Sequence, residues 1–298
     1  MPELPDDEIA WLRARTQPSR RSIVELIATG VLDAELAAVA WVLVSARVPV
    51  IVAGLARGVG KTTLLEAFLD FLPAGVRRMD LRGVHEDFAW LPEADRLGWA
   101  GDGPPAPGAS NEITPSRAFL VAAELSEHLP LYTWGAAART LVRAASIGYG
   151  IGATLHADRL EELHEELRSP AIGLKDDELS YLGLIVIVRP LRGPDGELRR
   201  RVVAAHYARP IGRDEHGHVQ RLPPAVIAVR DERTDRLEHF AWGVMPELAV
   251  RLGRKAGDLE REAADRSALL DALARDGVVD VASVRTAIAG QSPAPRVH

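Results

Sequence analysis

The sequence predicts an α/β protein in which helices cover both faces of a mostly parallel sheet. Apolar runs of strand length alternate with runs of helical spacing through the first two thirds of the chain, which is typical of parallel sheets. One apolar run, 48–53, leads directly into Gly54-Leu-Ala-Arg-Gly-Val-Gly-Lys-Thr-Thr63, and a helical pattern follows. A strand, a glycine-rich loop ending in Gly-Lys-Thr, and a helix are the context of a phosphate-binding loop, or P-loop.

The glycine-rich segment predicts a nucleotide site. Glycines let backbone N–H groups approach phosphates closely, and the N-terminus of the following helix adds free N–H groups and partial positive charge. Lys61 is expected to reach the β- and γ-phosphates of ATP, and the Thr62 hydroxyl to hold Mg²⁺. Five residues separate Gly54 from Gly60, one more than the general pattern. Either Leu55 stands where a glycine is usual or the loop is one residue longer. The residues expected to bind nucleotide are Gly54, Gly58, Val59, Gly60, Lys61, Thr62 and Thr63.

The remaining elements follow from periodicity, capping residues and turn signals. Ser22 and Glu25 have the spacing of a capping box, and Gly193-Pro-Asp-Gly196 predicts a hairpin turn. Strands are expected at 48–53, 76–81, 118–124, 150–156, 184–189, 199–206, 225–229 and 237–242. Helices are expected at 23–29, 32–45, 64–72, 136–146, 159–168, 246–252, 258–275 and 281–289.

These patterns suggest a division of the chain into four parts. A flexible arm is expected at 1–20, a P-loop domain at 21–210, a small, mainly helical α+β domain at 211–290 and a disordered tail at 291–298. Residues 99–112, rich in Gly, Pro, Ala, Asp and Ser, are expected to form a mobile loop.

Composition narrows the function. The chain has 298 residues, 47% of them apolar, no cysteine and a net charge of −6. Thiol chemistry and disulfides are therefore excluded, and the charge gives no general attraction to nucleic acid. No apolar run approaches a membrane span, and the acidic N-terminus lacks the features of a signal peptide. We expect a cytoplasmic protein.

Three polar residues lie at or just past the ends of predicted strands: Lys61, Glu124 and His156. Ligands of parallel sheets bind beyond the carboxyl ends of the strands, so one crevice is expected to collect all three. Glu124 suits an acid that orients a water molecule or the Mg²⁺ shell, although a strand-end carboxylate paired with an arginine is the simpler alternative. His156 is either a structural histidine or a sensor of the γ-phosphate.

Several stretches together resemble the motor ATPases of type II and type IV secretion, in particular those of archaella, archaeal pili and tight-adherence pili. Gly58-Val-Gly-Lys-Thr-Thr-Leu-Leu matches the family's Walker A motif, and Phe119 to Glu124 resembles its Walker B strand. The segment 147–158, with Thr-Leu-His-Ala, is similar to the family's histidine box, although Tyr149 replaces its first histidine. The similarity covers about residues 20–290 and leaves no counterpart of the family's N-terminal domain.

The resemblance implies a RecA-like ATPase domain and Mg-ATP as ligand. It also implies a ring, hexameric in the family, at the inner face of the membrane, where an inner-membrane platform protein would be its partner. The family's acidic loop typically reads Ile-Glu-Asp-x-x-Glu, and this chain has Leu81-Arg-Gly-Val-His-Glu86. Only Glu86, with Asp87 beside it, remains as a candidate second acid. Leu125 and Ser126 follow Glu124 where the family has an arginine, and 127–140 is longer than the family's spacing.

The leading expectation is a P-loop ATPase that powers pilus or secretion machinery, with Glu124, Glu86 and His156 as its catalytic residues. The alternative is a regulatory or structural subunit that binds nucleotide with weakened catalysis, as Arg82 and Gly83 in the acidic loop suggest. A DNA-processing ring ATPase is a weaker alternative, because no stripe of basic and aromatic residues accompanies the negative charge.

Other polar residues have simpler interpretations. Asp158 is expected to cap the helix 159–168, whose glutamates form a solvated face. His216 and His218 lack further ligands for a metal. The run 199–201 is expected on an exposed strand or a subunit contact. Arg77 and Arg78 are either surface charges or arginines that act on a neighbouring subunit.

Overall fold

The structure is a computed structural model, and it describes residues 20–92, 94–99, 113–193, 195–213 and 215–291. Most of the expected arm (1–20), most of the expected mobile loop (99–112) and most of the expected tail (291–298) lie outside these residues.

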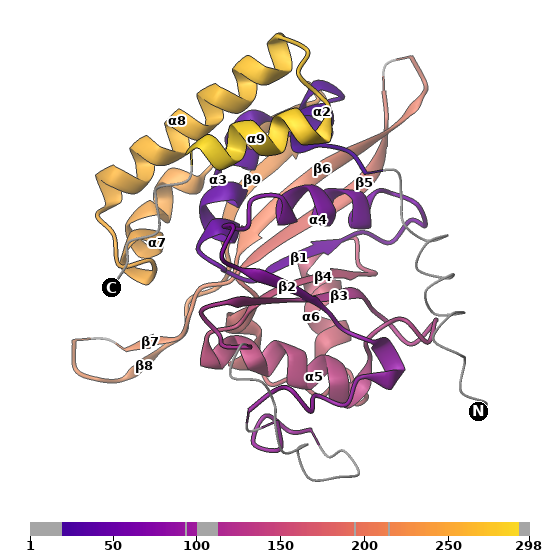
Figure 1. Cartoon of the computed structure of the whole chain (residues 1–298), viewed down its shortest axis with the longest axis vertical. Helices are drawn as coiled ribbons and strands as arrows, with labels where there is room; N and C mark the ends of the chain where they lie inside the picture. The colour runs from indigo at the N-terminus through magenta and orange to yellow at the C-terminus, as the bar shows by residue number, and fades with distance from the viewer. Residues whose placement is uncertain (1–19, 93, 100–112, 194, 214, 292–298) are drawn as a thin grey trace.

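One eight-stranded sheet forms the centre of the molecule (Figure 1). The five strands from β5 to β2 run parallel, and β6, β9 and β10 extend the sheet antiparallel beyond β5. In spatial order the strands are β10 (Arg236–His239), β9 (Ala225–Asp231), β6 (Leu198–Tyr207), β5 (Leu184–Arg192), β1 (Val50–Ala53), β4 (Gly150–Leu155), β3 (Ala118–Leu125) and β2 (Arg77–Asp80). The predicted α/β fold with a mostly parallel sheet is confirmed.

Helices cover both faces of this sheet (Figure 1). Val50 and Val52 of β1 point to one face, and Ile51 and Ala53 to the other, as the two-residue period of a strand requires. The first face packs against α2 (Ile23–Ala28), α3 (Ala34–Ser45), α4 (Lys61–Leu69), α7 (Met245–Arg251), α8 (Ala256–Arg275) and α9 (Val281–Gln291). The second face packs against α5 (Gly135–Ala144) and α6 (Leu160–Arg168).

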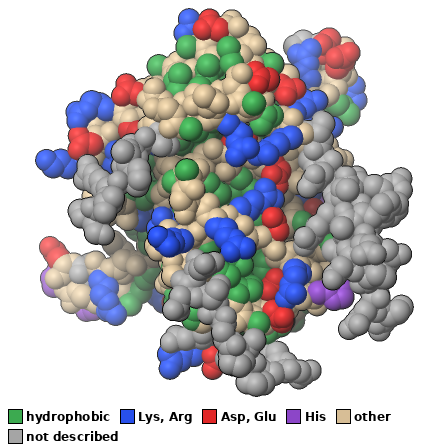
Figure 2. Space-filling view, viewed as in Figure 1, with side chains coloured by type: hydrophobic (Ala, Val, Ile, Leu, Met, Phe, Trp, Pro, Cys, Tyr) green, Lys and Arg blue, Asp and Glu red, His purple; other side chains and the backbone are tan. Residues whose placement is uncertain are grey.

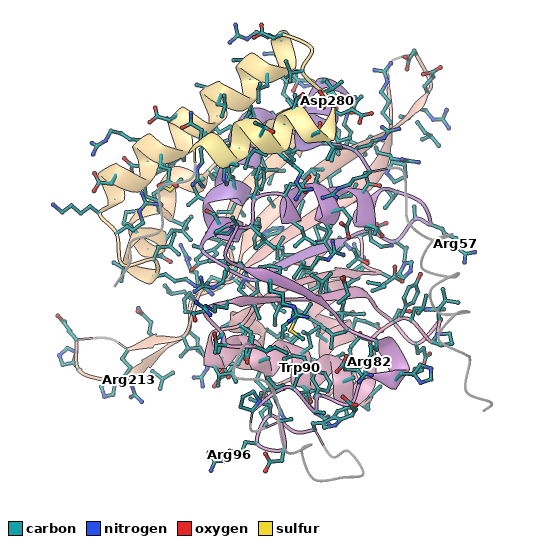
Figure 3. All side chains as sticks on the ribbon, in the orientation of Figure 1. Arg57, Arg82, Trp90, Arg96, Arg213 and Asp280 are labelled. Carbon is teal, nitrogen blue, oxygen red and sulfur yellow. The ribbon has the colours of Figure 1, made fainter. Side chains whose placement is uncertain are left out.

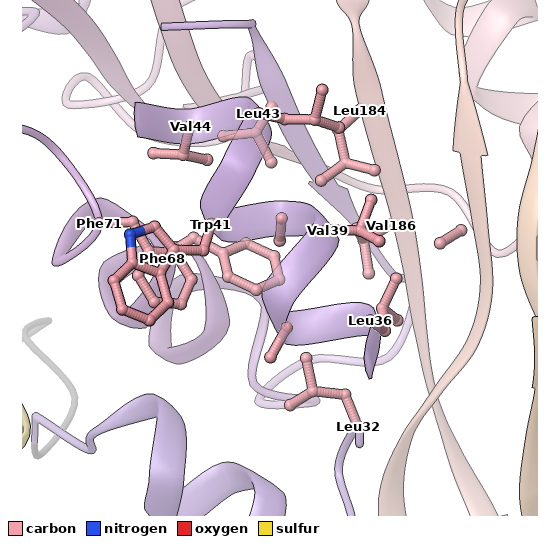
Figure 4. Packing of buried hydrophobic residues seen from close by; sticks show 14 of the residues in the cluster. Leu32, Leu36, Val39, Trp41, Leu43, Val44, Phe68, Phe71, Leu184 and Val186 are labelled. Atoms are coloured by element: carbon pink, nitrogen blue, oxygen red, sulfur yellow. The ribbon is translucent and has the colours of Figure 1, made fainter. Parts of the chain in front are cut away.

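The helix before the P-loop strand anchors the first layer. Asp33 caps α3 by accepting a hydrogen bond from Leu36 N at 3.0 Å. Trp41 of α3 is fully buried and stacks on Phe71, just past α4, with 5.2 Å between ring centroids (Figure 4). This packing fixes α4, whose first turn carries the end of the P-loop.

The C-terminal part shares the sheet and the core of the rest. β9 pairs with β6, α8 packs on α3, and Val284 and Ile288 of α9 are buried in the same cluster as Trp41. The predicted boundary at residue 210 thus falls between two strands of one sheet, and separate folding of 21–210 and 211–290 remains a prediction. A small two-stranded hairpin, β7 (Gly212–Arg213) and β8 (Val219–Gln220), projects from the body (Figure 1).

Among the described residues, no helix is both long enough and apolar enough to cross a membrane. Acidic and basic side chains are mixed on the face shown in Figure 2.

Candidate nucleotide-binding site

The glycine-rich loop connects the carboxyl end of β1 to α4, as predicted. Gly58 and Gly60 adopt φ of +71° and +100°, in the left-handed region that favours glycine. A Cβ on Gly54 would lie 2.5 Å from the carbonyl oxygen of Val188 in β5, so this position also requires glycine. Leu55 is 57% exposed, and Arg57 lies at the periphery of the molecule (Figure 3). The loop is therefore fixed at Gly54 and open to solvent beyond it.

The start of α4 is free for an anion. Gly60 is its N-cap and supplies no side-chain hydrogen bond to the first turn. The N–H groups of this turn therefore retain their capacity to bind phosphate. Lys61 begins the helix, and Thr62 and Thr63 follow it in partly exposed positions.

Lys61, Glu124 and His156 lie together at the carboxyl ends of β1, β3 and β4, with Glu124 the last residue but one of β3. Glu124 Oε1 lies 2.7 Å from His156 Nε2, and Glu124 Oε2 lies 3.8 Å from Lys61 Nζ. Lys61 Nζ donates to the Gly54 carbonyl oxygen at 2.9 Å and lies 3.5 Å from His156 Nδ1. β4 lies between β1 and β3 in the sheet, so Glu124 faces the loop across one strand. The gathering expected from the strand ends is present.

Burial gives this cluster its electrostatic character. Lys61 and Glu124 are each only 6% exposed. Burial lowers the pKa of Lys61, and the carboxylates of Glu124 and Asp158 partly oppose that shift. Glu124 Oε1 is close to His156 but is not aligned for a hydrogen bond. A buried ammonium and a buried carboxylate oxygen with unused bonding capacity fit a site for a nucleotide and its Mg²⁺.

Glu86 does not join the cluster. Its carboxylate is buried and accepts hydrogen bonds from Arg82 N, Phe88 N and Trp90 Nε1, each at 3.0 Å. Figure 3 shows Arg82 and Trp90 in this part of the molecule. Glu86 thus stabilises the turn after β2. Its described contacts are within this turn and not with Lys61 or Glu124, so its predicted catalytic role stays a prediction.

Asp158 does not cap α6, and that expectation is wrong. The N-cap of α6 is Arg159, which makes no side-chain capping bond. Asp158 Oδ1 instead accepts a hydrogen bond from Leu55 N at 2.8 Å, and Glu162 Oε2 accepts from Asp158 N at 2.9 Å. Asp158 therefore ties the start of the P-loop to the end of β4. The sequence feature that could have predicted this contact is the position of Asp158, two residues after His156 and just past the end of a strand.

Most of the other singled-out residues have structural partners. Arg78 pairs with Glu66 and Asp80. Arg201 is buried and pairs with Asp235, which excludes the exposed position expected for it. Arg200, in the same run, lies next to the glycine-rich loop. Its Cδ is 3.5 Å from the place that a Cβ on Gly60 would take.

Three remaining positions, Tyr149, His216 and His218, were singled out for the histidine box or for metal binding. The Tyr149 hydroxyl donates to the Ile113 carbonyl oxygen at 2.8 Å, away from the cluster. Within the part of the chain that the structure describes, His216 and His218 belong to no cluster of metal-ligating side chains.

Comparison with known proteins gives matches to solved structures alone, since no protein-family model and no curated protein matches the chain. The chain is similar to the VirB11 ATPase of the Brucella suis type IV secretion system, solved with sulphate. The two are 20% identical over 69% of this chain and 56% of that one, with a TM-score of 0.37.

Two DotB ATPases are also similar. The Legionella pneumophila protein is 12% identical over 84% of this chain and 64% of its own, with a TM-score of 0.29. The Yersinia pseudotuberculosis protein is 15% identical over 84% and 60%, with a TM-score of 0.30. The chain spans less than two thirds of the length of each of these three structures.

Proposed function

We propose that this protein is a P-loop ATPase of the secretion-motor class. The observation that carries the proposal is the cluster at the carboxyl edge of the sheet, where buried Lys61 lies 3.8 Å from buried Glu124 beside an uncapped helix N-terminus. Phosphoryl transfer to water depends on positioned charges more than on covalent chemistry by the protein. This cluster supplies such charges on two side chains that are themselves buried.

The residues have distinct roles in the proposal. The N–H groups of the 54–60 loop and of the first turn of α4 bind phosphate oxygens, and Lys61 exchanges the Gly54 carbonyl for the β- and γ-phosphates. Thr62 holds Mg²⁺, which neutralises charge on the phosphates when bound. Glu124 orients the attacking water, and His156, in contact with both Glu124 and Lys61, senses the γ-phosphate.

The wider role rests on the sequence resemblance. We propose that the chain assembles as a ring, a hexamer by that resemblance, and drives pilus or secretion machinery in contact with an inner-membrane platform protein. In this proposal it acts in the cytoplasm, at the inner face of the membrane, and binds no nucleic acid.

The second candidate is a nucleotide-binding regulatory subunit of such a machine. The engagement of Glu86 in its own turn favours it, because Glu86, the predicted second catalytic acid, is bonded within that turn while Glu124 pairs with Lys61. Both candidates require nucleotide at Lys61, and they differ in turnover.

The experiment measures Mg-ATP binding and phosphate release for the wild type, Lys61→Ala and Glu124→Gln. We expect Lys61→Ala to abolish binding, and Glu124→Gln to retain binding while losing at least tenfold in turnover, as for a positioned catalytic carboxylate. Binding through Lys61 with no phosphate release, even at concentrations that favour rings, would establish the second candidate. Absence of binding by the wild type would contradict both.

A further inference from the structure

Residues 126–132 form a loop that leaves the end of β3 and returns to it. Thr133 N donates to the Glu124 carbonyl oxygen at 2.9 Å, and Ser126 N donates to the Thr133 carbonyl oxygen at 3.2 Å. Leu125 and Thr133 form an isolated parallel bridge. These bonds close the base of the 126–132 loop directly beside Glu124, so its side chains are held close to the candidate site.

The 126–132 loop rests on the turn where the sequence expected a second acid. Val84 N donates to the Pro130 carbonyl oxygen at 2.9 Å. Gly83 has φ of +64°, and a Cβ there would lie 2.2 Å from the same oxygen. Gly83 thus admits the loop, and Glu86 shapes the turn that supports it.

His128 brings a fourth ionisable group to the cluster of Lys61, Glu124 and His156. Its ring lies edge-on to His156, with 5.9 Å between centroids. Ser126 Oγ bonds to His128 Nδ1 and also accepts from His128 N at 3.2 Å. Because Ser126 engages Nδ1, Nε2 is the ring nitrogen that remains to meet a ligand. His128 is exposed, so it borders the opening of the site and is not part of its floor.

Tyr132 lies at the other end of the loop, next to Thr133, whose N–H donates to the Glu124 carbonyl oxygen. Burial raises the pKa of its phenol, the negative charge of Glu124 raises it further, and Arg57 of the P-loop lowers it. Tyr132 therefore lies within electrostatic range of both Glu124 and the P-loop. The contact that places a side chain of the 126–132 loop at the cluster is the one between the rings of His128 and His156.

We infer that the 126–132 loop forms a second wall of the nucleotide site and that His128 Nε2 donates a hydrogen bond to the γ-phosphate. This inference rests on the proposed function. The loop contacts the turn 81–86 at Gly83 and Val84, and it adds the His128 ring beside His156. A γ-phosphate donor there distinguishes ATP from ADP, so the ligand class is a nucleoside triphosphate.

The test compares the affinities of fluorescent (mant) ATP and ADP in the presence of Mg²⁺ for the wild type, His128→Ala and Glu127→Ala. Glu127 is an exposed neighbour on the same loop and serves as the matched control. We expect His128→Ala to lose roughly tenfold in affinity for the triphosphate, the value of one charge-assisted hydrogen bond. Its affinity for the diphosphate and both affinities of Glu127→Ala should change less than about twofold, which is within the range of surface substitutions.

A second variant guards against a merely structural effect. His128→Gln retains a side-chain donor, and we expect it to restore part of the preference for the triphosphate. Equal losses for both nucleotides in His128→Ala, or an unchanged ratio, would overturn the inference. Failure of the proposed function looks different, because the wild type would then bind neither nucleotide or Lys61→Ala would bind as the wild type does.

Discussion

At the scale of single residues, close backbone contacts decide which positions tolerate no side chain. Gly54 packs against Val188 of β5, and Gly83 packs against Pro130 of the 126–132 loop. The glycines in the P-loop were readable from a motif. At Gly83 the sequence indicated only that an acid of the family pattern is replaced. The need for glycine there could not be predicted, because the neighbour, Pro130, lies more than forty residues away in the chain.

The contact at Gly83 makes a stability prediction. Gly83→Ala should reduce the free energy of unfolding by about 2 kcal/mol more than Gly196→Ala, because overpacking against backbone typically costs 1–3 kcal/mol. Both glycines have positive φ, but a Cβ on Gly196 would meet no atom within 4 Å. Urea denaturation measures the difference, and equal losses in the two variants would show that backbone strain, and not the contact with Pro130, dominates at Gly83.

At the scale of elements, a histidine joins β10 to the start of α3. His239 Nε2 lies 2.8 Å from Asp33 Oδ2, and its Nδ1 lies 3.7 Å from Glu35 Oε1. Burial alone would lower the pKa of His239, but the hydrogen bond and the charge of Asp33, with the charge of Glu35, raise it overall. The same Asp33 caps α3, so this pair links the edge of the sheet to the helix that precedes the P-loop strand.

The raised pKa of His239 predicts a pH dependence of stability. A histidine whose pKa is raised on folding stabilises the folded state. Its full contribution to the free energy of unfolding is present at pH values below the unfolded-state pKa of 6.5, and it is lost as the pH rises through the folded-state pKa. His239→Gln should therefore lower the free energy of unfolding more at pH 6 than at pH 9. Denaturation at both pH values measures this, with exposed His85→Gln as the control. A deficit that grows with pH would contradict the assignment.

At the scale of the whole molecule, one core joins the two ends of the described chain. A single buried cluster runs from Ile23 in α2 to Ile288 in α9, and β9 extends the sheet that holds the P-loop. Arg266 of α8 lies over the ring of Trp41 in α3 at 4.6 Å, and Arg285 of α9 lies 3.6 Å from Asp70 at the end of α4. The C-terminal helices therefore contact both α3 and the end of α4, the helix that follows the glycine-rich loop.

This shared core predicts one cooperative unfolding transition. Leu270→Ala in α8 should cost roughly 2–5 kcal/mol, as for a fully buried leucine, and should shift the fluorescence and circular dichroism transitions together. Leu198→Ala, at a residue 64% exposed, should change stability by about 0.5 kcal/mol or less. Two separated transitions, with only one moved by Leu270→Ala, would instead establish the boundary predicted at residue 210.

The sequence by itself determined the alternation of strands and helices, the glycine-rich loop between β1 and α4, and the strand ends near which Lys61, Glu124 and His156 lie. These features are local, because periodicity, glycine spacing and the edge reached by parallel strands depend on near neighbours in the chain.

Only the tertiary structure decided the fates of Glu86, Asp158 and His128. Each of these side chains contacts a group that folding brings close. The Glu86 carboxylate accepts hydrogen bonds within its own turn, and the Asp158 carboxylate accepts one from Leu55 N of the glycine-rich loop. The His128 ring lies beside the His156 ring. The pairing of β9 with β6 could likewise not be predicted from the sequence, because the pattern of a strand does not specify which strand it pairs with. Hydrogen-bond partners of buried polar groups are chosen by distance in space, and a single sequence does not contain that distance.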